Sequence, residues 1–580
     1  MKKLSWTIAA MLLLSVMTTM AQKSFTLDDL MSGGSNFWNL QPQNLYTAWW
    51  GDRLVRLDVD QCTVQGEKKP FLTTTAVNAT LSEADGRVTS LLYARFPYAD
   101  RTQALLYTGK AELLYDWKKG KTVWKRSRIA GASHTDLNMA SKAEAYVKDW
   151  NLYVLTAEGK QLQVSADGSR ELVYGQSVHR DEFGISKGTF WNPQGTLLAF
   201  YRMDQSMVTD YPMVDIAHRV AQPAPEKYPM AGMTSHKVSV GVFNPATQQT
   251  VYLKTADPTD RYFTNIAWSP DGKTIYVNEV NRDQNHAQLI SYDAASGQKI
   301  KVVLEERNSK YIEPMNPIVF LPWDDSKFIY QSRNEGYNAL YLYNTDGKRL
   351  SKLTDGKFEV IDLLGFNRKT KSAIYTSTEV SPLQHNVFSV QIANGKRQRI
   401  DDGTGVHYPS LSTGTGAYVV DNYSSPQIPR KIDLTNTANG KRQNLLTADD
   451  PWKGYTVPEI TCGTIKAADD STDLYYRMVK PVDFDANKKY PAVVYVYGGP
   501  HARNVTAARN YLTRGWEIYM AQKGYLVFIL DNRGSEHRGL EFENVTFRHL
   551  GVEEMKDQIK GVEFLKSLPY VDGSKLGAHG

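Results

Sequence analysis

The sequence predicts a two-domain protein, a β-propeller followed by an incomplete α/β domain. From about Lys23 to Tyr455, short runs rich in Val, Ile, Leu, Tyr and Thr alternate with Gly, Asn, Asp and Pro turns, a pattern typical of all-β structure. After residue 456, strands alternate with helical segments, which indicates a change of domain. The length of 580 residues is also too great for a single core.

A weak repeat indicates that the all-β segment, predicted over residues 22–455, is a propeller. A unit of strand, polar turn and strand recurs near residues 243, 292, 343 and 390, with a period of 47 to 51 residues. A period near fifty with four strands per unit is typical of propeller blades. Roughly 430 residues at this period allow seven or eight blades.

One proline-rich insertion breaks the repeat. Two aromatic–proline–glycine units, at Trp191 and Trp268, lie 77 residues apart. The excess falls in Ser206–His236, which contains four prolines. We expect this segment to form a loop or arm on the binding face of the propeller.

The second domain, predicted over residues 456–580, has the pattern of a parallel sheet. Tyr490–Pro500 and Gly524–Ser535 each begin with a continuous apolar run and end in a turn, as buried parallel strands do. Helical segments are expected at Asn504–Lys523 and Val552–Leu568. The last strand ends on Gly580, where a Gly-x-Ser-x-Gly nucleophile elbow would begin. The sequence therefore predicts an incomplete α/β-hydrolase domain that stops two residues before the nucleophile.

Residues 1–21 have the features of a signal peptide. Lys2 and Lys3 precede the apolar run Ile8–Met17, and Thr19-Met20-Ala21 fits a cleavage site. An apolar run of this length is too short to span a bilayer, so we expect no membrane anchor. The mature protein should begin at Gln22 and be secreted, most simply into the periplasm.

Charge and cysteine content exclude several classes of protein. Without Lys2 and Lys3 the formal net charge falls from +6 to +4, and the basic residues are scattered, so nucleic acid is not an expected partner. The eleven histidines show no His-Glu-x-x-His spacing, and we expect neither a metal nor a cofactor. Cys62 and Cys462 lie 400 residues apart. Two free thiols are the simpler interpretation, with a disulfide as the alternative.

Tyr497, before Gly498-Gly499-Pro500, is a candidate catalytic residue. In an α/β-hydrolase the loop after the third strand contributes a donor to the oxyanion hole, and the Tyr497 phenol is placed to supply one. The alternative is a tyrosine that merely ends a strand before a turn. The two later strands at suitable spacing favour the catalytic interpretation.

The segment His179–Gly184 is a candidate binding site. It concentrates a histidine and three charges, including Asp181 and Glu182, between apolar residues. A carboxylate on the inner rim of a propeller can bind the free α-amino group of a peptide. The alternative is a solvated turn, and composition does not decide between the two.

With these motifs in hand, the chain resembles the dipeptidyl peptidase IV branch of the prolyl oligopeptidase family of serine peptidases, and within it the secreted bacterial prolyl tripeptidyl aminopeptidases. The similarity extends over nearly the whole mature chain. The segments that carry it are Val173–Ile185, Lys187–Trp191, Phe200–Met207, Lys488–Pro500, Asp531–Gly534, His549–Gly551 and Asp557-Gln558.

The resemblance implies an eight-bladed propeller that caps an α/β-hydrolase, with the active site between them. It implies cleavage after proline, which releases short peptides from free N-termini. Glu182 matches the family's amine-binding glutamate, and Tyr497 matches its oxyanion tyrosine. Because the family often has two glutamates where this chain has Asp181-Glu182, the role of Asp181 and the choice between dipeptides and tripeptides stay open.

Gly580 matches the first glycine of the family's nucleophile motif, so the catalytic Ser, Asp and His are expected beyond residue 580. We therefore expect this chain to be an inactive fragment of a longer peptidase. The alternatives are a non-catalytic propeller that binds peptides or a partner protein, and a polysaccharide-binding propeller joined to an inactive hydrolase. Proline-containing peptides with free N-termini are the expected partners. The oligomeric state stays open, with a homodimer as one possibility.

Overall fold

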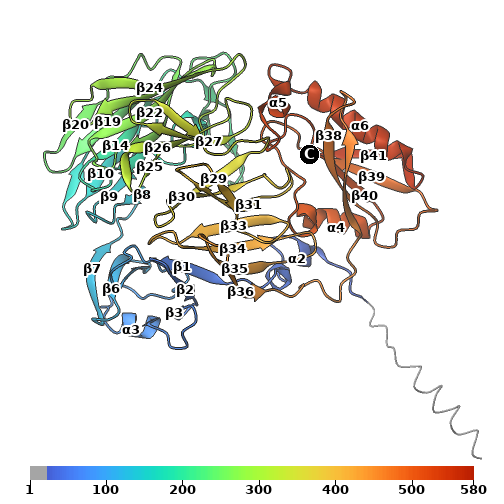
Figure 1. Ribbon diagram of the computed structural model, residues 1–580, viewed down its shortest axis with the longest axis horizontal. Coiled ribbons are helices and arrows are strands. Elements are labelled where there is room, and N and C mark those ends of the chain that lie inside the picture. Colours follow the sequence, from blue (N-terminus) through green and yellow to red (C-terminus); the bar gives the residue numbers. More distant parts are fainter. Residues whose placement is uncertain (1–21) are drawn as a thin grey trace, which may run out of the picture.

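The computed structural model describes residues 22–580, and the predicted signal peptide lies outside the described residues. A propeller and an α/β domain lie side by side (Figure 1). No helix between residues 22 and 580 combines the length and the apolar character needed to cross a membrane. In the same part of the chain Cys62 and Cys462 are both free thiols, so the disulfide is not formed.

The propeller has eight blades, which confirms the number implied by the family resemblance and is the larger of the two that the repeat allows. Each blade is an antiparallel sheet. Blades 1 to 4 consist of β1 (Tyr46–Trp50), β2 (Arg53–Leu57), β3 (Gln61–Val64) and β4 (Leu72–Thr73); β5 (Gln103–Tyr107), β6 (Ala111–Asp116) and β7 (Lys121–Ser127); β8 (Ser133–Leu137), β9 (Glu144–Lys148), β10 (Asn151–Leu155) and β11 (Gln161–Gln163); and β12 (Leu172–Tyr174), β13 (Thr189–Trp191), β14 (Leu198–Asp204), β19 (Lys237–Asn244) and β20 (Gln249–Tyr252).

Blades 5 to 8 have four strands each. They consist of β21 (Arg261–Trp268), β22 (Thr274–Asn281), β23 (His286–Asp293) and β24 (Lys299–Arg307); β25 (Val319–Leu321), β26 (Asp324–Ser332), β27 (Ala339–Asn344) and β28 (Arg349–Lys352); β29 (Val360–Asn367), β30 (Ser372–Ser377), β31 (Asn386–Gln391) and β32 (Arg397–Arg399); and β33 (Val406–Leu411), β34 (Tyr418–Ser424), β35 (Lys431–Asn436) and β36 (Arg442–Thr447).

The middle strands of a blade are more buried than its outer edge strand, which explains the repeated apolar runs in the sequence. All six residues of β30 are buried, because neighbouring blades cover both faces of a middle strand, whereas the edge strand β36 is largely exposed. Side chains join the first blade to the last. Trp49 Nε1 donates to Ser410 Oγ at 3.1 Å, and Ser412 Oγ donates to Asp52 Oδ1 at 2.7 Å.

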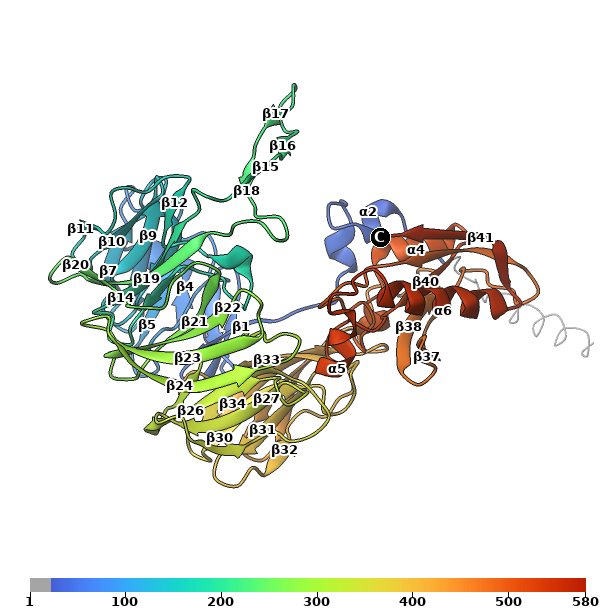
Figure 2. The same ribbon diagram turned by 90° about the horizontal axis from the view of Figure 1, so that it is seen from above.

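The proline-rich insertion forms an arm, as predicted. In Ser206–His236, β15 (Asp210–Tyr211) pairs with β18 (Glu226–Lys227), and β16 (Val214–Asp215) pairs with β17 (Gln222–Pro223). Figure 2 shows these strands projecting from the propeller as a narrow hairpin.

The α/β domain contains a five-stranded mixed sheet in the order β37-β38-β40-β39-β41. Its strands are β37 (Ile460–Lys466), β38 (Asp473–Val479), β39 (Tyr490–Tyr495), β40 (Leu526–Leu530) and β41 (Val571–His579), and its helical elements are η3 (Arg509–Leu512), α4 (Gly515–Gln522), α5 (Leu540–Glu543), η4 (Asn544–Thr546) and α6 (Glu553–Ser567). All five residues of β40 are buried. Phe528 packs in the cluster that includes Leu565 of α6, and Ile529 packs in the cluster that includes Ala521 of α4.

The helix expected over Asn504–Lys523 begins only at Gly515. The preceding residues are held in an irregular conformation by a buried arginine. Arg477 Nη1 donates to the carbonyl oxygens of Asn504, at 2.6 Å, and Tyr511, at 2.7 Å. Two carbonyl oxygens that would accept backbone hydrogen bonds within a helix therefore accept hydrogen bonds from the Arg477 side chain instead.

The first described residues pack against the α/β domain, although the sequence assigns them to the propeller segment. The segment includes α2 (Leu27–Leu30) and η1 (Phe37–Leu40), and a third short helix, α3 (Thr74–Asn78), lies in blade 1. Phe25 N–H donates to Gln522 Oε1 of α4 at 2.7 Å, and the Phe25 ring stacks on Tyr455 with centroids 4.4 Å apart. The blades themselves run from β1 to β36.

Candidate active site

The turn that carries Glu182 has an unusual backbone. η2 covers His179–Asp181, and its three residues have φ values of 54°, 58° and 63°. A left-handed conformation costs a non-glycine residue roughly 1–2 kcal/mol, so three in succession require support from the surrounding structure. Strain of this kind is concentrated at binding and catalytic sites.

Buried contacts hold this turn against blade 5. The buried His179 ring accepts a hydrogen bond at Nε2 from the backbone N–H of Phe263, at 3.1 Å. On its other side, His179 Nδ1 lies 2.9 Å from Nε2 of His236. Asn265 Nδ2 donates to the Phe183 carbonyl oxygen at 3.4 Å. Tertiary contacts thus support the left-handed backbone of this turn.

The two carboxylates of the turn are in different situations. Asp181 and Glu182 are both exposed, but Asp181 accepts a hydrogen bond from the Ser177 hydroxyl. Within residues 22–580 no side chain forms an ion pair or hydrogen bond with the Glu182 carboxylate. A carboxylate on a rigid turn with no protein partner can accept an ammonium group without first breaking another contact. Of the two carboxylates, Asp181 is engaged and Glu182 is free of side-chain partners in the described chain.

Tyr497 lies just after β39, beside the end of β41. The two strands are parallel, with Tyr495 opposite His579, and Val496 N–H donates to the His579 carbonyl oxygen at 2.8 Å. Gly580 therefore lies beside Val496 and close to the backbone of Tyr497. The Tyr497 side chain is 64% exposed, so its hydroxyl is accessible to a ligand.

Two asparagines fix the backbone of the tyrosine loop. Asn504 Nδ2 donates to the Tyr497 carbonyl oxygen at 2.9 Å, and Asn532 Nδ2 donates to that of Gly498, also at 2.9 Å. A Cβ at Gly498 would lie 2.2 Å from Asn532 Oδ1, so the close approach requires glycine. The phenol is thus carried on a loop whose backbone is held in place.

The connection from blade 5 to blade 6, residues 308–318, lies between the two candidate regions. A Cβ at Gly184 would lie 2.2 Å from the Met315 carbonyl oxygen, so the Glu182 turn packs directly on this loop. Two residues earlier, Glu313 Oε1 lies 3.3 Å from Nε2 of His501, which follows the Gly-Gly-Pro turn after Tyr497. The structure thereby connects both predicted site regions through one short segment.

The pKa values of Glu313 and His501 are shifted by their contact with each other. The hydrogen bond to Glu313 raises the pKa of His501 against the opposing effect of burial. Burial raises the pKa of Glu313, but the contacts with His501 and Arg333 lower it overall. Both directions favour an ion pair across the boundary between the domains.

Around this pair, a cavity of about 240 Å³ opens between the propeller and the α/β domain. Burial raises the pKa of Glu359 in this cavity to about 7 and also raises that of Glu536. The cavity lining therefore includes carboxyl groups that take up protons more readily than exposed ones. No group of three or more His, Cys, Asp or Glu residues suited to a metal ion occurs in the described part of the chain.

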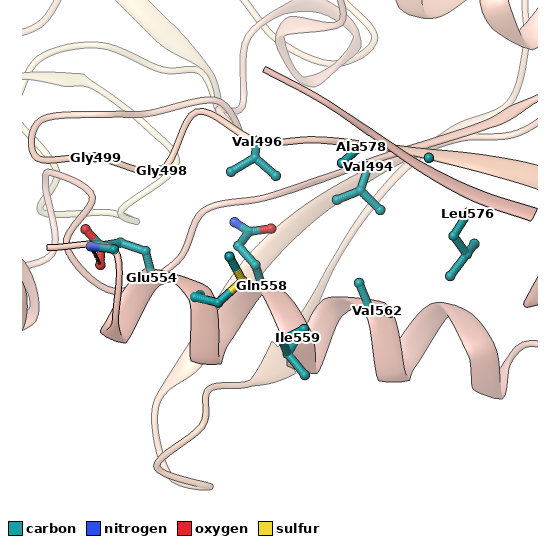
Figure 3. A pocket seen from close by; sticks show the side chains of 13 residues that line it. Val494, Val496, Gly498, Gly499, Glu554, Gln558, Ile559, Val562, Leu576 and Ala578 are labelled. Carbon is teal, nitrogen blue, oxygen red and sulfur yellow. Dashed lines mark hydrogen bonds between the residues drawn. The ribbon is translucent and has the colours of Figure 1, made fainter.

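A second cavity, of about 500 Å³, lies between α6 and the strands β39 and β41. Figure 3 shows Ile559, Val562 and Leu576 around one part of it, and Glu554 near Gly498 and Gly499 at the other. Its lining is mainly apolar, with Glu554 and Gln558 as the polar side chains, and it includes neither Glu182 nor Tyr497.

Several residues around the site were not found from the sequence. Glu313 and His236 occur in segments without a motif, and only tertiary contacts reveal their relation to the site. His501 directly follows the Gly-Gly-Pro turn, which is the one local signal that was available. The predicted residues Glu182 and Tyr497 lie in different domains, on either side of the Glu313–His501 contact.

Comparisons with known families match both parts of the chain. Residues 107–430 match the family described as Dipeptidyl peptidase IV (DPP IV) N-terminal region, and residues 512–580 match the Prolyl oligopeptidase family. These matches agree with the predicted order of a propeller followed by part of an α/β-hydrolase domain.

Relatives of known sequence are named as dipeptidyl peptidases. Proteins named dipeptidyl-aminopeptidase B from Arthroderma otae and Pyrenophora teres f. teres are 26% and 27% identical over 480 and 482 residues. The alignments cover 76% and 77% of this chain but 51% and 52% of the relatives. The chain thus spans about half the length of these curated relatives.

Two solved structures share the fold. A structure from Bacteroides ovatus, described as a dipeptidyl aminopeptidase IV, is 48% identical with a TM-score of 0.91, and the match covers 96% of this chain and 81% of that one. Dipeptidyl peptidase 4 from Porphyromonas gingivalis, at 23% identity, has a TM-score of 0.80 with the same coverage, 96% and 81%. At that lower identity the likeness concerns the fold alone.

Proposed function

This chain belongs to the dipeptidyl peptidase IV branch of the prolyl oligopeptidase family, and from this membership we propose that the whole protein is a secreted serine exopeptidase that cleaves after proline near a free peptide N-terminus. One observation carries the proposal. The Glu182 carboxylate is exposed and unpaired on a strained, well-supported turn, which suits the binding of a peptide ammonium group.

In the proposed mechanism, the two domains hold opposite parts of the substrate. Glu182 binds the α-ammonium group of the peptide. The distance between the Glu182 carboxylate and the nucleophile determines which peptide bond is attacked. The serine hydroxyl attacks the carbonyl carbon of the proline. A histidine acts as the general base, and an aspartate orients this histidine. The Tyr497 hydroxyl donates a hydrogen bond to the oxyanion that forms.

The serine, histidine and aspartate of this mechanism are expected after residue 580. Residues 22–580 supply the amine anchor and one oxyanion donor, so we propose that a protein made of these residues alone binds peptides but does not hydrolyse them. The family names of the relatives favour release of dipeptides, and release of tripeptides is the alternative. Chromogenic Gly-Pro and Ala-Ala-Pro substrates distinguish the two.

Secretion and self-association are further parts of the proposal. The signal peptide at residues 1–21 would direct the protein to the periplasm, with mature chains that start at Gln22. N-terminal sequencing of the purified periplasmic protein checks both points. A homodimer is the assembly to look for, and light scattering over a concentration series measures it.

Glu182→Gln in the full-length peptidase is the direct test. The bound substrate is expected to cover the Glu182 carboxylate, and loss of one partner of such a buried charge pair costs about 2–5 kcal/mol. The value of kcat/KM for substrates with a free N-terminus should therefore fall at least about thirtyfold. Asp181→Asn is the matched control and should have the smaller effect. An unchanged kcat/KM for Glu182→Gln would refute the anchoring role, and binding without turnover by the unaltered full-length protein would favour the non-catalytic alternative.

A further inference from the structure

The arm, residues 206–236, contacts the Glu182 turn at two points near its base. The Arg180 guanidinium lies 4.6 Å from the ring centroid of Tyr228, which directly follows β18. His236, the last residue of the arm, is buried and lies 2.9 Å from His179 in the turn. The arm is therefore attached both to blade 4, which it interrupts, and to the turn beneath it.

The hydrogen bonds of this region determine where the protons lie. A backbone N–H can only donate, so His179 Nε2 must be the acceptor of the bond from Phe263. A neutral His179 then carries its proton on Nδ1 and donates to His236 Nε2. The result is one directed chain, from Phe263 through His179 to His236.

Both histidines are in surroundings that keep them neutral. Burial, with His236 close by, lowers the pKa of His179 well below its usual value. Burial, together with Arg282 and Arg180, lowers the pKa of His236 to about 4. The edge of the Tyr262 ring also packs against His179, with centroids 5.1 Å apart. A proton on His179 Nε2 or on His236 Nε2 would place two donors face to face.

We propose that His179 and His236 are positioning residues, whose hydrogen-bonded chain holds the left-handed turn and fixes the Glu182 carboxylate relative to the base of the arm. His236 is the acceptor that satisfies the second nitrogen of His179, a role that its place outside the turn does not suggest. Without it, a buried N–H would have no partner, and the turn would lose one of the contacts that offset its backbone strain. This inference rests on the proposed function in one respect, namely that Glu182 binds the substrate's ammonium group.

The alternative explanation is that the two rings only fill space, and two substitutions separate the hypotheses. His236→Gln keeps an acceptor close to the position of Nε2, whereas His236→Phe keeps a ring but removes the acceptor. His218→Phe is the matched control, because His218 lies in the same arm, is exposed, and pairs with Asp215 of that arm at 3.0 Å.

The first measurement is hydrogen exchange on residues 22–580, which needs no catalysis. The amides of Asp181 and Glu182 donate to the carbonyl oxygens of Val178 and His179, so their exchange reports whether the turn is formed. His236→Phe should speed it about tenfold or more, while His236→Gln and His218→Phe should change it less than about threefold. Equal exchange in the Phe and Gln variants would overturn the proposal.

The second measurement is the kinetics of the full-length peptidase. His236→Phe should raise KM for free N-terminal substrates about tenfold with kcat changed less than about threefold, because the anchor is displaced while the reacting groups stay in place. His236→Gln should restore KM. A fall in kcat alone would overturn the positioning role. If the unaltered full-length protein has no peptidase activity, the proposed function fails, and the exchange experiment still decides whether His236 holds the turn.

Discussion

At the scale of single residues, the candidate site combines fixed backbones with free side chains. The Glu182 carboxylate has no protein partner in the described chain, yet its turn is held by His179 and Asn265. The Tyr497 hydroxyl is exposed, yet its loop is held by Asn504 and Asn532. A group prepared in this way needs little reorganisation when a ligand binds, which is the arrangement that catalysis by oriented hydrogen bonds requires.

Tyr497→Phe tests this interpretation in a full-length protein that has the proposed peptidase activity. An oxyanion donor acts mainly in the transition state, so its removal should lower kcat about 10²–10³-fold and leave KM within about twofold. Tyr525→Phe is a suitable control, because Tyr525 is a partly exposed tyrosine that directly precedes β40. Steady-state kinetics with one proline substrate measures all variants. A change confined to KM would rule out the oxyanion role.

At the scale of elements, one buried ion pair joins β38 to α4. Arg477 Nη2 lies 2.7 Å from Glu517 Oε1, and both side chains are completely buried. Burial raises the pKa of Glu517 and lowers that of Arg477, although each partner acts in the opposite direction. Such a pair is expensive to bury, and removal of one partner leaves an uncompensated charge.

Glu517→Ala should therefore destabilise the α/β domain by about 3–5 kcal/mol. The same substitution should loosen Asn504–Tyr511, whose carbonyl oxygens Arg477 also binds. Lys556→Ala is the control, because its pair with Glu553 lies on the surface of α6 and should be worth less than about 1 kcal/mol. Denaturant unfolding of both variants gives the comparison. Equal stability losses would show that Arg477 finds other compensation.

At the scale of the whole molecule, two domains from distant parts of the sequence share one boundary. Arg333 of blade 6 pairs with Glu543 of α5 at 2.6 Å, and Lys310 donates to Asn544 Oδ1 at 2.8 Å. The Glu313–His501 pair lies along the same boundary, next to both candidate site regions. The relative placement of Glu182 and Tyr497 thus depends on contacts between domains.

The Glu313–His501 contact should depend on pH. The pKa of His501 is raised from 6.5, so its contribution is complete below pH 6.5 and is lost as the pH rises through the higher folded value. The pKa of Glu313 is lowered from 4.5, so its contribution is complete above pH 4.5 and is lost at lower pH. The pair is therefore strongest between these two values.

A double-mutant cycle with Glu313→Gln and His501→Asn measures this contact. Because His501 is about half exposed, the coupling energy should be modest, about 0.2–1 kcal/mol at pH 6, and it should approach zero at pH 9. Thermal unfolding of the four proteins at each pH provides the values. A coupling energy that is the same at both pH values would contradict the charged pair.

Much of the architecture follows from the sequence alone. The period of about fifty residues indicates a propeller, and the proline-rich interruption at Ser206–His236 marks the arm, because both depend on local patterns of strands and turns. The motifs around Glu182 and Tyr497 likewise identify both residues as candidates without coordinates. Features that depend on a few neighbouring residues, such as strands, turns and short motifs, are the ones that a single sequence predicts most directly.

Tertiary structure decides the rest, because long-range contacts leave no local pattern. The packing of Phe25 against α4 and the irregular backbone at Asn504–Tyr511 both depend on partners far away in the chain. The same holds for the difference between Asp181 and Glu182, since only the folded turn shows which carboxylate is engaged and which is free. The sequence by itself determined the fold class and the candidate residues. The tertiary structure decided how buried contacts, including that of His236, hold the strained turn that carries Glu182.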